Sequence, residues 1–249
     1  MKLYHYTSFD SFVRIWFTKT LLFSPSGNVN DILERTRGVK TDYIWRYEEL
    51  QLFTNLLESY KQISLTRDYS DKVKGFMSPM MWGQYGCKGQ GVCIELDSKE
   101  IECPEGVWAR PITYTDELQY IRLPENAFSE EGMLEYVQEN IEDILFKKHT
   151  SWEKENEYRF ISRSQEKIKI ASAISAIYVQ NGQSVDSSIL HDIVNNQVPV
   201  LVMKYEEVNG ILSPKVYSWE GYHRLFENTV RSQEETERLV ASFGIGKKA

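Results

Sequence analysis

The sequence has few cysteines and no long hydrophobic run. Cys87, Cys93 and Cys103 are odd in number and lack C-x-x-C spacing, which disfavours a disulfide framework or a zinc site and favours reduced thiols. The first residues do not have the pattern of a signal peptide, and no apolar stretch is long enough to span a membrane. We therefore expect a soluble cytoplasmic protein with no membrane partner.

Positive charge and phosphate-binding motifs are also scarce. The net charge of -7 disfavours long-range attraction to a polyanion, although Arg35, Arg37, Lys40 and Arg46 form a local basic cluster. Neither G-x-x-x-x-G-K-[ST] nor G-x-G-x-x-G after a strand is present. Without repeats or Pro-rich linkers, we expect one domain over residues 1–249, with its motifs within 1–182 and further strands and a helix in 183–249.

Hydrophobic periodicity predicts the α+β class. Alternating or β-prone residues predict strands at 3–7, 21–24, 63–66, 92–96, 107–114, 175–179, 198–205 and 215–219. Helical spacing and capping residues predict helices after Ser8, over 42–60 and 129–148, from Asp186 to Ile193, and near the C-terminus, starting at Ser232. In the first helix, we expect the core-facing residues to be Phe9, Phe12, Val13, Trp16 and Phe17.

Three carboxylates alternate before a β-prone run. Glu153, Glu155 and Glu157 precede Tyr158 to Ile161, and a strand starting near Glu155 would place Glu155 and Glu157 on one face, with Cα atoms about 7 Å apart. Repulsion would raise the proton affinity of one carboxylate unless cations intervene, and Lys154 and Arg159 are the nearest candidates. A salt-bridged strand edge in solvent would give the same pattern.

Two other stretches could belong to a site or to the core. His5 lies near the end of a strand that turns directly into a buried helix, which is a rigid place for a side chain. Trp82 and Tyr85 have helical spacing within a glycine-rich stretch that allows close backbone approach or sharp turns. A core histidine and a core aromatic pair are the simpler interpretations.

Four motifs in order resemble a bacterial family of unknown function. They are L-Y-H-Y at 3–6, N-D-x-x-E at 30–34, M-W-x-x-Y at 81–85 with Gly91, and W-x-x-E-x-E-Y-R at 152–159. Together they span most of residues 1–182, and Lys88 stands where this family favours histidine. The family is in turn similar to the ADP-ribosyltransferase superfamily, which implies a split β-sandwich that clasps NAD, with flanking helices.

The second resemblance implies roles for individual residues. Glu157 would be the late glutamate that stabilises positive charge on the ribose as nicotinamide leaves, and Glu155 would deprotonate the acceptor. His5 would orient the cofactor, and Tyr85 or Trp82 would stack on the nicotinamide ring. The full NAD-binding set implied is His5, Tyr6, Thr7, Asn30, Asp31, Trp82 and Tyr85.

The resemblance therefore predicts a mono-ADP-ribosyltransferase that uses NAD to modify RNA, DNA or protein. Related families are often toxins or antiphage effectors, so a cognate antitoxin is an expected partner. Three alternatives stay open: a metal-dependent nuclease, a non-enzymatic module whose aromatics stack on bases, and a cysteine hydrolase. The nuclease would use Asp31, Glu34, Glu155 and Glu157, and the hydrolase would pair Cys87 or Cys93 with His149.

Overall fold

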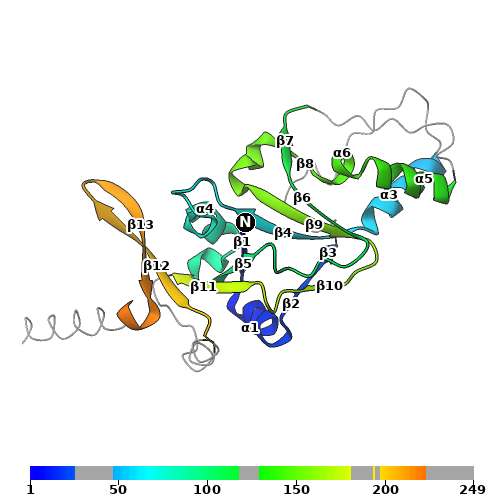
Figure 1. Ribbon diagram of the computed structural model, residues 1–249. Coiled ribbons are helices and arrows are strands. Elements are labelled where there is room, and N and C mark those ends of the chain that lie inside the picture. The colour runs from blue at the N-terminus through cyan, green and yellow to red at the C-terminus, as the bar shows by residue number, and fades with distance from the viewer. Residues whose placement is uncertain (26–46, 118–128, 181–192, 194–196, 223–249) are drawn as a thin grey trace, which may run out of the picture.

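The computed structural model describes residues 1–25, 47–117, 129–180, 193 and 197–222. In this part of the chain, nine strands form one mixed sheet in the order β13-β12-β11-β5-β1-β4-β9-β6, with β3 paired to β4 (Figure 1). Their bounds are β1 Lys2–Thr7, β3 Ser24–Pro25, β4 Lys61–Arg67, β5 Val92–Asp97, β6 Val107–Pro111, β9 Glu157–Ser162, β11 Ile174–Gln180, β12 Val200–Val208 and β13 Ile211–Ser218. The predicted α+β class is confirmed.

Strand β1 lies inside the sheet and leads directly into helix α1 (Phe9–Thr18). Ser8 has an extended backbone and accepts a hydrogen bond from the Ser11 N–H at 3.3 Å, so it is the predicted N-cap. Phe12 and Trp16 are buried, but Phe17 is 70% exposed, and its predicted core position is wrong. It follows Phe12 by five residues, about 140° around the helix, beyond the face that meets the sheet.

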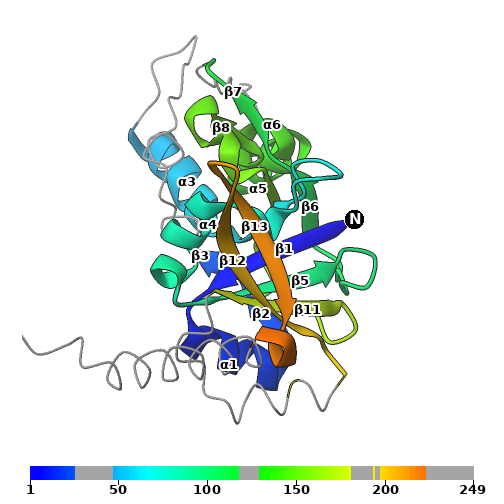
Figure 2. The same cartoon turned by 90° about the vertical axis from the view of Figure 1, so that its left-hand side faces the viewer.

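Helices cover the sheet on different sides. Figures 1 and 2 show α1 on one side of the molecule, and α3 (Tyr47–Glu58), α5 (Glu130–Glu139) and α6 (Ile141–Leu145) on the other. These three helices share a core with Ile161 of β9 and Ile112. Helix α4 (Pro79–Gln84) buries Met81 and Trp82 in a further cluster with Tyr4 and Tyr6 of β1. The helix expected over 42–60 is confirmed from Tyr47 to Glu58 in the described residues.

The long helix predicted over 129–148 is wrong at its end. The chain leaves helical geometry at Asn140, between α5 and α6, and continues as strand β8 (Lys147–His149). Strand β8 pairs in parallel with β7 (Thr113–Thr115), outside the main sheet. The single strand predicted over 107–114 is therefore two strands, because Pro111 ends β6 and β7 joins β8. Tertiary pairing has overridden the helical spacing of this segment.

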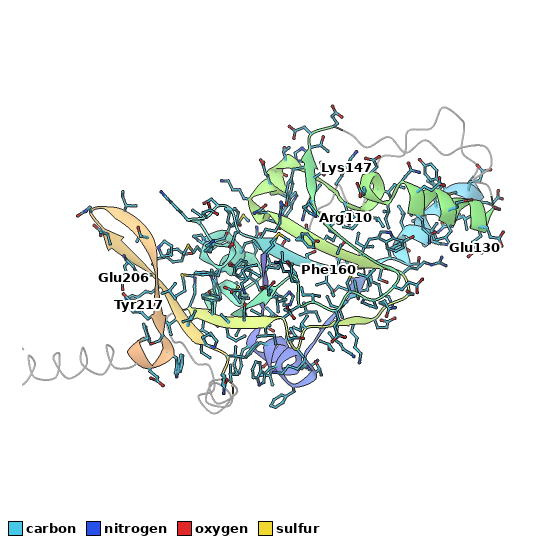
Figure 3. All side chains as sticks on the ribbon, viewed as in Figure 1. Arg110, Glu130, Lys147, Phe160, Glu206 and Tyr217 are labelled. Atoms are coloured by element: carbon cyan, nitrogen blue, oxygen red, sulfur yellow. The ribbon has the colours of Figure 1, made fainter. Side chains whose placement is uncertain are left out.

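The other predicted strands are present, except that residues 21–24 divide between two strands, Thr20–Leu22 and Ser24–Pro25, and the last strand begins earlier, at Ile211. Strands β2 (Thr20–Leu22) and β10 (Lys167–Lys169) form a separate pair. The β12–β13 hairpin projects from one end of the sheet, and Figure 3 shows Glu206 and Tyr217 beside each other on it, where the Tyr217 hydroxyl donates to Glu206 at 2.8 Å. The helices expected after Asp186 and Ser232 lie outside the described residues. In the part that the structure describes, no helix has the length and apolarity needed to cross a membrane.

Candidate active site

The main sheet opens between β1 and β4. Strand β1 pairs with β5 along its whole length, but it pairs with β4 only at Leu3 opposite Arg67 and Tyr4 opposite Thr66. Beyond these two pairs the strands part, and a cavity of about 250 Å³ lies against them. It is lined by Tyr4, His5, Tyr6, Leu22, Ser24, Pro25, Gln62, Ile63, Ser64, Leu65, Thr66, Met81, Tyr85, Lys148, Glu155 and Glu157.

The two glutamates of the E-x-E motif meet at this cavity without sharing a strand. Glu155 ends a short 3-10 helix (Thr150–Glu155), and Glu157 is the first residue of β9. Asn156 between them has a left-handed backbone, with φ of 47°. The predicted strand start near Glu155 is therefore wrong by two residues. The carboxylates still converge, because the tight turn at Asn156 brings both onto Lys148.

Lys148 bridges the two carboxylates. Its Nζ lies 2.6 Å from Glu155 Oε2 and 3.4 Å from Glu157 Oε2, and all three side chains are at most 6% exposed. Pairing of β8 with β7 places Lys148 opposite Tyr114, and the Nζ lies 4.9 Å from the centre of the Trp152 ring. The sequence analysis named Lys154 and Arg159 as the intervening cations; Arg159 does contact Glu157, but Lys148 takes the place predicted for Lys154. In the sequence, Lys148 looks like a cation that ends a helix. The strand that holds it, β8, has three residues, which is too short for an alternating pattern to be visible.

Arg159 holds Glu157 from the other side. Its Nε donates to Glu157 Oε1 at 2.7 Å and its Nη2 to Glu157 Oε2 at 3.0 Å, while Nη1 donates to the Leu145 carbonyl at 2.9 Å. Burial raises the pKa of Glu157, but Arg159, Lys148 and a hydrogen bond with Ser64 outweigh it and hold this pKa at about 2. Glu157 is therefore a buried carboxylate that stays ionised at neutral pH.

His5 lies on the β1 wall of the same cavity. Burial lowers the pKa of His5 to about 4, more than hydrogen bonding with the Ser64 backbone raises it. The ring is thus neutral at pH 7. Its Nδ1 is sealed from solvent and has no hydrogen-bond partner. Such an atom is costly to leave unpaired in a core.

Other predicted residues divide between the cavity and the core. Tyr85 lines the cavity, and its hydroxyl donates to Glu155 Oε1 at 2.5 Å. Tyr6 also contributes to the lining, while its hydroxyl donates to the Gly75 carbonyl at 2.6 Å. Trp82 is 1% exposed, donates from Nε1 to the Phe76 carbonyl at 2.8 Å and does not line the cavity. The core interpretation therefore describes Trp82 better than ring stacking with a ligand.

Thr7, another predicted NAD-binding residue, does not line the cavity and is 9% exposed. Its carbonyl lies only 2.2 Å from where a Cβ on Gly91 would be, so Gly91 allows the close backbone approach predicted for this stretch. Asn30, Asp31 and Glu34 lie outside the described residues.

The alternative chemistries find little support in the described residues. There, no group of three or more His, Cys, Asp or Glu side chains is placed to hold a metal ion, and the oxygens of Glu155 and Glu157 face Lys148 and Arg159 instead. Cys93 is fully buried. His149 contacts Ser151 Oγ at 2.8 Å and Asp116 at 3.4 Å, which assigns it to a local surface network.

Residues 81–160 match DUF2971, a protein family of unknown function. The matched segment runs from α4 to β9 and contains Tyr85 and the three charged residues of the cavity lining, Lys148, Glu155 and Glu157. The match carries no function and shows no link to ADP-ribosyltransferases. No curated protein and no solved structure matches the chain.

Proposed function

We propose that this protein is an NAD-dependent mono-ADP-ribosyltransferase with the split sheet of that superfamily. The observation that carries the proposal is the shared cavity: His5 from β1 and the Glu155–Glu157 pair line it together, at the place where β1 and β4 part. These residues are about 150 positions apart in the chain, and an ordinary core or a solvated strand edge does not require them to meet. An effector role with a cognate antitoxin belongs to this proposal through the resemblance alone.

The size of the cavity fits one end of NAD. Pockets for drug-sized ligands typically have volumes of about 300–1,000 Å³, and this cavity, at about 250 Å³, is slightly smaller. It would take the nicotinamide and its ribose, and the adenosine end would extend beyond it. Among the tyrosines that line the cavity, Tyr85 is the one expected from the resemblance to contact the nicotinamide ring.

The charge on Glu157 fits the proposed chemistry. Cleavage of the bond between nicotinamide and ribose leaves positive charge on the ribose, and a fixed anion beside it stabilises that charge. Arg159 and Lys148 hold Glu157 ionised and in one position, so little reorganisation is needed during the reaction. The lone-pair positions of Glu157 are taken by Arg159, Lys148 and Ser64, so its part in the proposed reaction is electrostatic, whereas the acceptor would be deprotonated by Glu155.

The neutral state of His5 suits a positioning role. A neutral imidazole has one nitrogen that donates and one that accepts, so it can orient a ribose hydroxyl without adding positive charge where the reaction develops it. The Nδ1 of His5 has no partner and is sealed from solvent, so this contact requires the ring to turn toward the cavity. A protonated histidine would oppose the charge on the ribose.

The test uses NAD labelled on the adenosine side, incubated with the purified protein and with protein, RNA and DNA extracts. Wild type should release nicotinamide and transfer label to one acceptor class, or release free ADP-ribose. Glu157→Gln keeps the shape but removes the charge and should slow nicotinamide release by about 10²–10³. Glu142→Gln changes a glutamate whose side chain is 68% exposed and should match wild type. Absence of both nicotinamide release and label transfer in wild type would refute the proposal.

A further inference from the structure

Asn156, the middle residue of the E-x-E motif, has a strained backbone. Its φ of 47° lies in the left-handed region, which costs a residue with a side chain about 1–2 kcal/mol. Asparagine adopts this region more readily than most residues, because its short polar side chain can form local hydrogen bonds. The turn at Asn156 joins Glu155 at the end of a 3-10 helix to Glu157 at the start of β9. Whatever holds this turn therefore also decides where the two carboxylates lie.

Every polar group of Asn156 has a partner, and most of the partners belong to Arg67 and Asp68. The Asn156 carbonyl accepts hydrogen bonds from the Arg67 N–H at 2.9 Å and from Arg67 Nε at 3.4 Å, and Asn156 Oδ1 accepts one from Arg67 Nη2 at 2.7 Å. Asn156 Nδ2 donates to the Asp68 carbonyl at 2.9 Å and to the Arg67 carbonyl at 3.4 Å. The Asn156 N–H donates to the Glu153 carbonyl at 3.0 Å. These bonds fix both the main chain and the side chain of Asn156.

The segment that holds Asn156 belongs to the wall of the cavity. Arg67 is the last residue of β4, and it forms one of the two residue pairs that join β4 to β1 before the strands part. Tyr69, two residues further on, donates from its hydroxyl to the Lys154 carbonyl at 2.6 Å. Residues 67–69 therefore tie the E-x-E turn to the strand that faces His5 across the cavity.

From these contacts, and resting on the proposed function, we infer that Asn156 and Arg67 are positioning residues for the reaction. Neither is among the described residues that line the cavity, so neither is placed to touch the nicotinamide and ribose proposed to bind there. Both act through the turn, which they hold so that Glu155 and Glu157 face the cavity together. Such precision matters, because a misplacement of about 1 Å can lower a rate by about 10²-fold.

Asn156→Gly tests the inference, because glycine adopts a φ of 47° without strain but lacks the side-chain bonds to Arg67 and Asp68. In the labelled-NAD assay, kcat for nicotinamide release should fall by about 10–100-fold. KM for NAD should stay within about twofold of wild type, because the cavity lining is unchanged. Arg67→Met should behave in the same way. The double variant should have a kcat within about threefold of either single variant, because both changes remove the same contact.

Asn209→Gly is the matched control. Asn209 also has a left-handed backbone, with φ of 55°, but it lies in the turn between β12 and β13, so this change should leave kcat and KM at wild-type values. Circular dichroism checks that each variant is folded, and Arg67→Met decides alone if Asn156→Gly is not. Wild-type kcat in a folded Asn156→Gly or Arg67→Met variant, or a rise in KM that accounts for the whole loss of kcat/KM, would overturn the inference.

Amide hydrogen exchange keeps the inference testable if wild type does not release nicotinamide, an outcome that would refute the proposed function alone. The N–H groups of Asn156 and Glu157 are both hydrogen-bonded. If Arg67 holds the turn, these two amides should exchange at least about tenfold faster in Arg67→Met than in wild type, and amides later in β9 should not change. Unchanged exchange at Asn156 and Glu157, or faster exchange throughout β9, would overturn the inference.

Discussion

Replacing Arg159 with methionine is the sharpest test of the electrostatics of this site. The guanidinium is fully buried and contacts both oxygens of Glu157, so Arg159→Met leaves a buried carboxylate with Lys148 at 3.4 Å and a hydrogen bond with Ser64. The Glu157 pKa of about 2, against an ordinary 4.5, corresponds to about 3 kcal/mol of stabilisation at neutral pH. This value agrees with the cost of about 3–5 kcal/mol for removing one partner of a buried ion pair.

The direction of the Glu157 pKa shift determines how the stability difference changes with pH. Because the folded pKa of Glu157 lies below the unfolded value, its stabilising contribution is complete above pH 4.5 and is lost as the pH falls towards 2. Arg159→Met lacks most of that contribution. The difference in unfolding free energy between wild type and variant should therefore be about 3 kcal/mol at pH 7 and should shrink steadily below pH 4.5. At neutral pH, Arg159→Met should lower the Tm by about 10 °C.

The assay is urea unfolding at a series of pH values from 7 to 3, with the free energy taken from the midpoint and slope. Arg110→Met is the control, because Arg110 pairs with Glu142 on the surface, where both side chains are more than half exposed. That change should cost less than about 1 kcal/mol. Adding Glu157→Gln to Arg159→Met should recover stability, because the unpaired charge is gone. A gap that stays constant from pH 7 to 3 would refute the assignment of Arg159 as the residue that holds Glu157 ionised.

Two further predictions concern β1. Gly91→Ala should destabilise the fold by at least about 2 kcal/mol, because the new Cβ would lie 2.2 Å from the Thr7 carbonyl. The control, Gly83→Ala in α4, meets nothing within 4 Å and should stabilise the fold by about 0.5–1 kcal/mol. Thermal unfolding compares the two variants, and equal effects would contradict the close approach at Gly91. The His5 ring should stay neutral until about pH 4, as followed by its ring-carbon NMR shifts, and a midpoint above pH 6 would contradict its burial. Since the unfolded chain protonates near pH 6.5, His5 should lower stability as the pH falls from 6.5 to 4, and His5→Asn should lack that slope.

Local patterns predicted several elements correctly. Ser8 caps α1 because its side chain reaches an amide three residues later, and β5 and β11 follow from short apolar runs. The prediction was wrong where distant segments decide. Residues 147–149 have helical spacing, yet they pair with 113–115, and Phe17 continues an apolar stripe that the sheet does not reach.

The site was predictable in part. Motif order singled out His5, Tyr85, Glu155 and Glu157, and these four do line one cavity, although their chemical roles stay predictions. Lys148 was missed because it meets Glu155 only through the bend of the chain between β8 and Glu155. No residue spacing in the sequence indicates that bend. Ser64, which hydrogen-bonds Glu157, was missed for a similar reason: it lies on β4, the strand paired with β9, opposite Arg159.

The early parting of β1 from β4 has a consequence for how this protein could diversify. Past Tyr4 and Thr66 the two strands do not pair with each other; the Ser64 backbone bonds His5 there, and a ligand could bond to the other facing peptide groups. Such contacts persist whatever side chains evolution places on the strands. Replacement of Leu22 or Gln62 on the cavity wall could then change which molecule is bound, while the main-chain contacts to that molecule stay the same.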